Sequence, residues 1–319
     1  ENLSHQEQNY CQSNFNMTQD MLWENTWHMH RIKYENSEIA KKTISKLEKI
    51  RKGKSFPAID KKAICSWNCM MVIGLLDSSI AYKNTGWLDK AENLLHIVLK
   101  RFTNNKYQCN RLVYVDNIIE GTLEDYAWVI SATIKIGKIK NSSYWFKLSA
   151  HWIEATISKF WVKDKSLFKL SSEQTLFKEV FEIEDQVIPS SNSVMASNLH
   201  EIYKITYDKS FLKICKDMLS VIGLNAEKSP SNFTNWMLLS RELNSPKKQY
   251  ILIGFSVEDL LELYHQKEPL DDVYLLEKNS DLTIFKEKYK PNKKNIFICN
   301  EKFCMPAVLS IKEAVSLEI

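Results

Sequence analysis

Apolar residues recur at helical spacing along most of the chain, in two kinds of segment. Segments 63–81 and 127–139 are apolar almost all round, which is typical of helices buried on both sides. Segment 88–102 instead has one apolar face, with lysine, glutamate and arginine elsewhere around the helix. Apolar inner helices that alternate with amphipathic outer helices predict an α/α toroid.

The alternation repeats along the chain. Residues 87–91, 145–149 and 211–215 share one order of residue types: an aromatic residue, an apolar residue, two variable positions and a small residue. Their separation of about 60 residues is the length of a helical hairpin with its loops, as in other helical arrays. Each of these segments is predicted to open the second helix of a pair.

The two ends of the chain differ from this array. Residues 1–33 are polar and show little periodicity, and a helix capped by Ser37 is predicted for 37–52. After Pro246 the composition changes to short apolar runs typical of strands. The predicted strands are 250–254, 273–276 and 296–299, and the predicted helices are 257–265 and 310–317. We therefore predict a mainly α fold: an irregular segment (1–33), a partial (α/α) toroid (34–245) and a small α/β appendage (246–319).

The starts of the inner helices carry the candidate chemistry. Helices in the same ring position point the same way, so three N-termini are expected to meet at one mouth. The middle one begins at Gly121, where Thr122 can cap the helix and Glu124 and Asp125 place two carboxylates in its first turn. Residues 167–188, with alternating strand-like positions, are predicted to form a loop or hairpin over this mouth.

Carboxylates, amides, hydroxyls and aromatic rings together suit a polyhydroxylated ligand, which needs stacking and hydrogen bonds. The candidate catalytic residues are Asp125, Asp60 and Asp185, and the candidate substrate-binding residues are Trp67, Asn68, Glu124, Tyr126, Ser190 and Asn192, with Ser66 and Ser191 beside them. A purely structural alternative stays open. Ser, Thr, Asp and Asn are ordinary N-caps, so Asp125 and Thr122 could only cap their helix, and Trp67 could belong to the core.

Composition and charge limit the partners and the cellular location that we expect for this chain. The 319 residues contain 43 Lys and Arg against 39 Asp and Glu, a net charge of +4, and the lysines are scattered, which does not favour nucleic-acid binding. The longest apolar run, residues 69–76, is much shorter than the ~20 residues of a membrane-spanning helix. We expect a cytoplasmic protein without a membrane segment. Because the chain begins with Glu1 rather than methionine, a fragment or processed product is also expected.

Cysteine and histidine do not indicate a cofactor or metal. The seven cysteines include the close pairs Cys65 with Cys69 and Cys299 with Cys304, but no Cys-x-x-Cys, so a redox enzyme is not favoured and most cysteines are expected to be buried thiols. His28 and His30 lack further ligands nearby. We predict neither a metal nor a cofactor.

Four ordered stretches resemble the spermatogenesis-associated protein 20 family. They are Pro57-Ala-Ile-Asp-Lys-Lys-Ala-Ile-Cys-Ser-Trp-Asn68, Gly121-Thr-Leu-Glu-Asp-Tyr-Ala127, Ile188-Pro-Ser-Ser-Asn-Ser193 and Ile298-Cys-Asn-Glu-Lys-Phe-Cys-Met-Pro-Ala-Val308. The resemblance implies the later hairpins of a barrel like those of N-acylglucosamine 2-epimerase and the six-hairpin glycosidases. It also implies an upstream thioredoxin-like domain with a Cys-x-x-Cys, which this chain lacks. Where the family has Pro-His-x-Asp-Asp-Lys, residues 57–62 lack the histidine and one acid.

Two functions follow as hypotheses. The first is a carbohydrate-active site that acts on a sugar-like molecule. A glycosidase needs two carboxyl groups about 5–9.5 Å apart, and Asp60, Asp125 and Asp185 could supply them. An epimerase ranks lower because no histidine lies at the three helix starts. The second is a non-catalytic binding domain that works with a thioredoxin-like domain.

Overall fold

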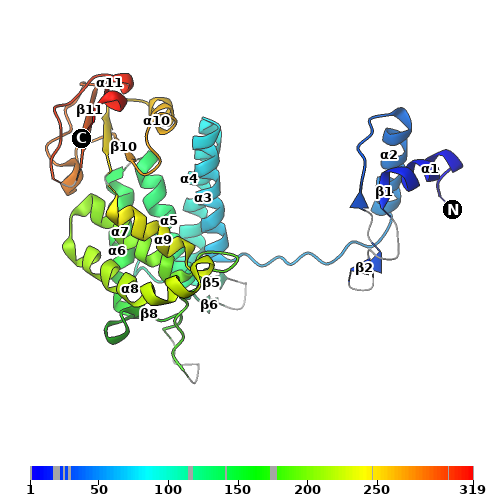
Figure 1. The fold of residues 1–319 in the computed structure, drawn as a ribbon, viewed down its shortest axis with the longest axis horizontal. Helices are drawn as coiled ribbons and strands as arrows, with labels where there is room; N and C mark the ends of the chain where they lie inside the picture. Colours follow the sequence, from blue (N-terminus) through cyan, green and yellow to red (C-terminus); the bar gives the residue numbers. More distant parts are fainter. Residues whose placement is uncertain are drawn as a thin grey trace. The chain divides into compact units, whose positions relative to one another are not determined.

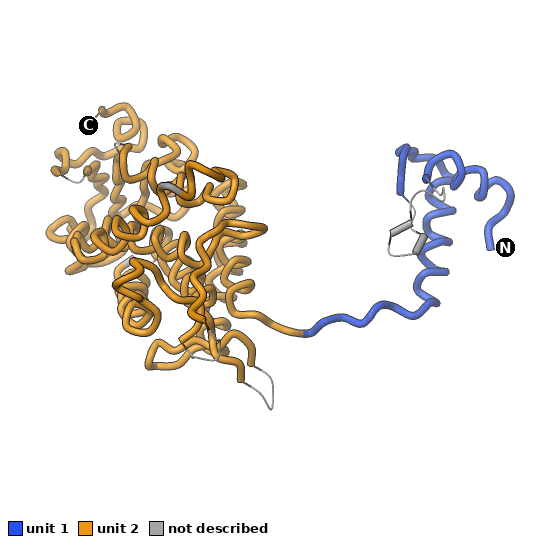
Figure 2. Tube along the Cα trace, turned by 60° about the horizontal axis from the view of Figure 1, so that its bottom comes forward, with its two compact units in different colours: residues 1–61 blue, residues 62–319 orange. Residues whose placement is uncertain are grey.

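Contacts divide the chain into two compact units, Glu1–Lys61 and Lys62–Ile319 (Figure 2). The computed structural model describes residues 2–16, 22–23, 26–27, 30–113, 118–140, 142–172, 178–245, 247–300 and 302–318. Within these ranges no helix has the length and apolar character needed to cross a membrane. The boundaries predicted at 33/34 and 245/246 differ from this division and stay predictions.

The first unit holds two helices. Helix α1 (His5–Asn14) lies in the segment for which the sequence predicts no regular structure. It starts at a capping box, in which Glu7 N donates to Ser4 Oγ and Ser4 N donates to the Glu7 carboxylate. Helix α2 (Glu38–Lys52) is capped by Ser37, as predicted. Four two-residue strands complete the unit: β1 (Phe15–Asn16) pairs with β4 (His30–Arg31), and β2 (Leu22–Trp23) pairs with β3 (Thr26–Trp27).

The second unit consists mainly of alternating inner and outer helices (Figure 1). The inner helices are α3 (Cys65–Ala81), α5 (Leu123–Ile139), α7 (Ser191–Thr206) and α9 (Thr234–Asn244), and each contacts the next. The outer helices are α4 (Thr85–Phe102), α6 (Ser142–Phe160) and α8 (Lys209–Lys228), each packed on the inner helix before it. The predicted mainly α fold of helical hairpins is confirmed.

The inner helices differ in burial. Helix α5, with neighbours on both sides, is buried on most of its faces, as its apolar sequence predicts. Helix α3 is equally apolar, yet Trp67 and Met71 are 60% and 58% exposed. Within the described part of this unit, α5 is the inner helix that packs on α3, and the opposite face of α3 has no inner helix against it.

Short strands connect the hairpins. They are β5 (Asn110–Val113) paired with β6 (Ile118–Glu120), and β7 (Trp161–Val162) paired with β8 (Leu167–Phe168) across the 3-10 turn η2 (Lys163–Lys165). The predicted loop or hairpin over 167–188 thus contributes one short strand. Its apolar positions Leu176 and Phe177 lie outside the described residues. Another 3-10 turn, η3 (Pro230–Asn232), precedes α9.

The C-terminal part forms a three-stranded sheet in the order β10-β9-β11. Strand β9 (Gln249–Ile253) runs parallel to β10 (Asp272–Leu276) and antiparallel to β11 (Asn295–Cys299). The parallel pair is connected through α10 (Val257–Tyr264), and η4 (Thr283–Phe285) and α11 (Ile311–Ser316) complete the appendage. These elements match the predicted strands and helices within about two residues, a margin usual for element ends. Strand β10 packs against α5 and α6.

Candidate functional site

Asp125 is fully buried at the start of α5 and caps two helices at once. Its Oδ2 accepts hydrogen bonds from Thr122 N at 3.0 Å and from Arg111 Nη1 at 3.2 Å. Its Oδ1 accepts from Ser66 N, in the first turn of α3, at 3.1 Å. One carboxylate therefore satisfies orphan backbone donors of two neighbouring inner helices.

Asp185 repeats this arrangement one hairpin later. Its Oδ1 accepts from Ser190 N, the N-cap residue of α7, at 2.9 Å, and from Ser193 Oγ at 2.8 Å. Its Oδ2 accepts from Asn235 N, in the first turn of α9, at 2.8 Å. Two of the three candidate catalytic aspartates, Asp125 and Asp185, thus have one structural role in common, which is to join successive inner helices at their N-termini.

The predicted binding residues are also engaged within the protein. Tyr126 Oη accepts from Cys109 N at 3.0 Å, and Asn192 bonds both backbone groups of Phe168, at 2.8 and 2.9 Å. The other contacts are Ser66 Oγ to Glu124 Oε1 at 2.5 Å, Asn68 Nδ2 to Ile64 O at 2.8 Å, Ser191 Oγ to Glu182 Oε2 at 2.7 Å, and Ser193 N to Ser190 Oγ at 3.3 Å. Trp67 is exposed on α3, and Asp60 belongs to the first unit.

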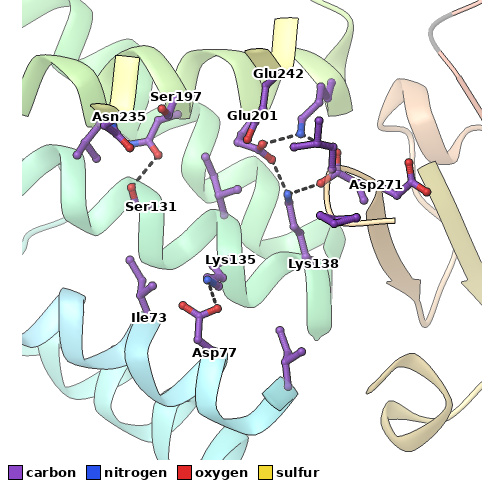
Figure 3. A pocket seen from close by; sticks show the side chains of 18 of the residues that line it. Ile73, Asp77, Ser131, Lys135, Lys138, Ser197, Glu201, Asn235, Glu242 and Asp271 are labelled. Carbon is purple, nitrogen blue, oxygen red and sulfur yellow. Dashed lines mark hydrogen bonds and ion pairs between the residues drawn. The ribbon is translucent and has the colours of Figure 1, made fainter. Parts of the chain in front are cut away.

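A groove lies along the faces of the four inner helices (Figure 3). This inner groove has a volume of about 480 Å³. Its middle is lined by polar side chains of successive helices: Trp128 and Ser131 of α5, Ser197 and Asn198 of α7, and Asn235 of α9. None of the predicted site residues lines it. The sequence signal was present but not used, since Ser131, Lys135 and Lys138 recur at helical spacing in an otherwise apolar helix.

Hydrogen bonds fix the polar wall of the inner groove. Ser131 Oγ donates to Asn198 Oδ1 at 2.8 Å, and Asn198 Nδ2 donates to Ala127 O at 2.8 Å. Asn235 Nδ2 donates to Ser193 Oγ at 3.0 Å. The buried indole Nε1 of Trp128 has no hydrogen-bond acceptor among the described residues. The groove therefore offers ordered hydroxyls and amides and one buried donor without a protein partner.

An ionic network closes the groove where the appendage begins. Lys138 Nζ lies 2.5 Å from Glu201 Oε2 and 2.6 Å from Asp272 Oδ1. Lys204 Nζ lies 2.5 Å from Glu201 Oε1 and 2.6 Å from Asp272 Oδ2. Two ammonium groups thus face two carboxylates, and the network binds β10 to α5 and α7 (Figure 3).

In this network, charge pairing shifts the pKa values more strongly than burial does. Burial alone would raise the pKa of Glu201 and Asp272, but the two lysine ammonium groups outweigh it and lower both pKa values. Burial alone would lower the pKa of Lys138 and Lys204, but the carboxylates raise both. Glu242 has its pKa lowered to about 2, because His200, Lys204 and Lys247 outweigh its burial.

These shifts predict a pH profile of stability. Because their pKa values are lowered, the carboxylates contribute to the free energy of unfolding. This contribution is fully present above about pH 4.3, the usual Glu pKa, and is lost as the pH falls further. Because their pKa values are raised, the two lysines also contribute to the free energy of unfolding. This contribution is fully present below about pH 10.4, the usual Lys pKa, and is lost as the pH rises further. Urea unfolding across this range should give a plateau between those limits. An unfolding free energy at pH 3 equal to that at pH 7 would contradict the assignment.

One group of side chains has the spacing of metal ligands. Ligand atoms of His200, Glu201 and Glu242 all lie within 4.8 Å of one another. However, Glu201 is paired with two lysines, and Lys247 Nζ lies 3.2 Å from Glu242. A divalent cation would face these ammonium groups, so we assign no metal here. Of the histidines singled out from the sequence, His28 lies outside the described residues and His30 lies in β4 of the first unit.

A second cavity of about 610 Å³ lies next to the inner groove. It is formed by α7, α9, the segments before β9 and β10, and the turn after β11. Basic side chains are frequent in its lining: His200, Lys204, Arg241, Lys247, Lys248 and Lys302. Acidic Glu242, Glu268, Asp271 and Asp272 face the same space, so the second cavity has a mixed, highly charged wall.

Known proteins support the resemblance that the four motifs indicate. The chain is 21% identical to human spermatogenesis-associated protein 20 over 224 residues, which are 66% of this chain and 28% of that protein. The chain is similar to spermatogenesis-associated protein 20. It is also 23% identical, over 158 residues, to an uncharacterized protein of Caenorhabditis elegans, covering 47% of this chain and 22% of that protein. The chain thus spans about a quarter of the length of these relatives. No protein-family model matches.

Solved structures with related helical arrangements include two carbohydrate-active proteins. A GH76 α-mannanase of Bacteroides thetaiotaomicron gives a TM-score of 0.44 at 16% identity, covering 54% of this chain and 47% of that chain. A D-mannose isomerase gives a TM-score of 0.41 at 13% identity, covering 50% of this chain and 40% of that chain.

Proposed function

We propose that this chain is a non-catalytic binding domain that holds a polar, sugar-like molecule in the inner groove. The observation that carries this proposal is Trp128, which lines the groove and whose buried indole N–H has no hydrogen-bond acceptor among the described residues. A buried donor without a partner costs about 1–3 kcal/mol, which a ligand oxygen would recover. The hydroxyls of Ser131 and Ser197 and the amide of Asn235 line the same groove.

The contacts and pKa values of the acidic side chains support a non-catalytic role. Asp125 and Asp185 accept hydrogen bonds from helix N-termini, so they serve as caps. In the inner groove, Glu201, Glu242 and Asp272 have lowered pKa values, which keeps them ionised near neutral pH. A glycosidase requires one protonated carboxyl group as general acid, and these three do not supply it.

A hydrolase is the second candidate because of Asp271. Burial raises the pKa of Asp271, its Oδ2 has no hydrogen-bond donor among the described residues, and it lines both cavities. A raised pKa is what a general acid needs. The adjacent Asp272 is held by Lys138 and Lys204, which argues against its use as the second carboxyl group.

Titration calorimetry with neutral aldoses, N-acetylated amino sugars and uronic acids tests the proposal. Trp128→Phe keeps an aromatic ring but removes the N–H, and it should weaken binding about 5- to 10-fold, the value of one net hydrogen bond of about 1–1.4 kcal/mol. Trp67→Phe is the matched control, because Trp67 does not line the groove, and it should leave the affinity unchanged.

Two results would contradict this proposal. One is that no sugar of the panel binds, or that both tryptophan variants lose affinity equally. The other is turnover of aryl-glycosides that disappears in Asp271→Asn while the fold is retained, which would establish the hydrolase instead.

A further inference from the structure

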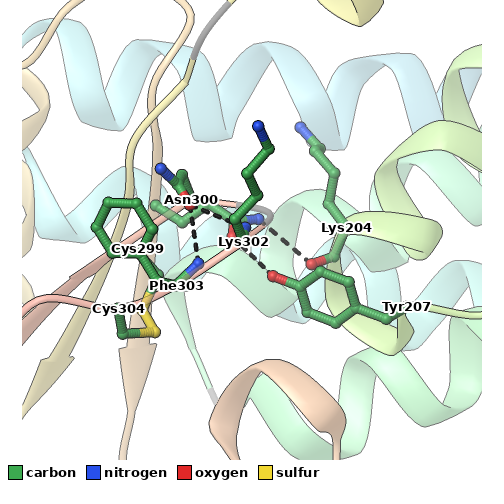
Figure 4. The surroundings of a disulfide bond; sticks show 8 residues. Lys204, Tyr207, Cys299, Asn300, Lys302, Phe303 and Cys304 are labelled. Atoms are coloured by element: carbon green, nitrogen blue, oxygen red, sulfur yellow. Dashed lines mark hydrogen bonds between the residues drawn. A yellow bond between two sulfur atoms is a disulfide. The ribbon is translucent and has the colours of Figure 1, made fainter. Parts of the chain in front are cut away.

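The turn after β11 is closed by a disulfide between Cys299 and Cys304 (Figure 4). Asn300 organises the backbone inside it: Asn300 Oδ1 accepts from Lys302 N at 2.8 Å and from Phe303 N at 3.0 Å. Asn300 N donates to Phe303 O at 2.9 Å. No redox pair was predicted here, because the two cysteines lack Cys-x-x-Cys spacing.

The two cysteine residues differ in their exposure to solvent. Cys304 is exposed, whereas Cys299 is 1% exposed at the end of β11. The remaining cysteines, Cys11, Cys65, Cys69, Cys109 and Cys215, are free and buried. An external thiol therefore meets one sulfur of the disulfide before it meets any other cysteine of the chain.

The fold depends little on this disulfide. It joins residues only five positions apart, and closing so short a loop contributes less stability than closing a long loop would. Strand β11 is held independently by its antiparallel pairing with β9. Reduction should thus leave the sheet folded.

We propose that the Cys299–Cys304 disulfide is a thiol–disulfide exchange site that a dithiol reduces. We further propose that its redox state determines how firmly Asn300 and Lys302 are held in the wall of the second cavity. A thiolate of the dithiol attacks Cys304 Sγ, forming a mixed disulfide, while the bond between the two protein sulfurs breaks and Cys299 leaves as a thiolate. The second thiol of the reductant then attacks its own bound sulfur and releases Cys304. The reductant becomes a disulfide, and the protein gains two electrons and, once both thiolates are protonated, two protons.

Basic side chains lie around the turn, among the charged residues of both signs that line the second cavity. Lys302 lies within the turn, and Lys204 and Lys248 line the same cavity. Figure 4 shows Lys302 within the turn and Lys204 nearby, with both side chains extending away from the two sulfurs.

The same turn connects the disulfide to the second cavity. Asn300 and Lys302, both between the two cysteines, line that cavity. With the disulfide open, the turn keeps only its hydrogen bonds, so these two side chains lose part of their restraint. This inference is independent of the proposed function, which concerns the inner groove.

Mild reduction of the native chain tests the site. The chain is treated with dithiothreitol without denaturant and then alkylated with iodoacetamide, and the labelled peptides are mapped by mass spectrometry. We expect label at Cys299 and Cys304 and none at the five buried cysteines, which are internal controls. Peptide mapping also separates this disulfide from any bond between Cys65 and Cys109, whose Sγ atoms lie 3.4 Å apart.

Hydrogen exchange provides the second measurement. In the reduced chain the amides of Lys302, Phe303 and Met305 should exchange faster, while those of β9 keep their protection. The Cys304→Ser variant should reproduce the reduced pattern without any reductant. The proposal is overturned if the disulfide opens only when the buried cysteines are labelled too, or if exchange in the turn is the same in the oxidised and reduced chains.

Discussion

Asp272→Ala is expected to lower the free energy of unfolding by about 3–5 kcal/mol, the usual effect of removing one partner from a buried ion pair. The carboxylate of Asp272 contacts the ammonium groups of Lys138 and Lys204, and the side chains of all three are at most 15% exposed. The substitution leaves two buried lysines sharing Glu201 alone. Urea unfolding followed by circular dichroism gives the change directly.

Asp281→Ala is the matched control for this prediction. Asp281 also forms an ion pair, with Lys147, but its side chain is 76% exposed, so its removal should change the stability little. In the double variant Lys138→Met/Asp272→Leu one charge of each sign is removed, and part of the lost stability should return. If Asp272→Ala and Asp281→Ala lowered the free energy of unfolding equally, the buried ionic network would contribute no more than an exposed ion pair, which would contradict the prediction.

Asp125→Asn is expected to lower the free energy of unfolding by about 2 kcal/mol. An asparagine side chain has one acceptor oxygen, so it cannot serve Ser66 N and Thr122 N together, and it loses the charge that pairs with Arg111. Hydrogen exchange should show the loss at the starts of both α3 and α5. Faster exchange at α5 alone would contradict the role of Asp125 as a cap for two helices.

The sequence predicted those features that depend on local pattern. Periodicity located the inner and outer helices, and short apolar runs located β9, β10 and β11 within about two residues. Capping by Thr122 and Asp125 was one of two alternatives left open by the sequence, and both residues take part in a capping box. Helix α1 was missed because it has few apolar positions, although Ser4 and Glu7 have the spacing of a capping box.

Contacts between distant segments could not be read from the sequence. The bond from Ser66 N to Asp125 spans 59 positions, so the sequence could not show that this candidate catalytic acid also caps a second helix. Likewise, Asp272 directly precedes the predicted strand 273–276, but its pairing with Lys138 and Lys204 depends on how the appendage packs against α5 and α7. Local patterns define elements, whereas the use of a carboxylate depends on which elements meet.

The most direct test of the account is the affinity of Asp125→Asn for the sugar that the native chain binds best, measured by titration calorimetry at a temperature where the variant is folded. Because Asp125 acts as a cap and does not line the inner groove, the account predicts an unchanged Kd despite the lower stability. Loss of binding in a variant whose circular dichroism spectrum matches that of the native chain would contradict it. That result would instead support a functional site at the N-termini of the inner helices, as predicted from the sequence.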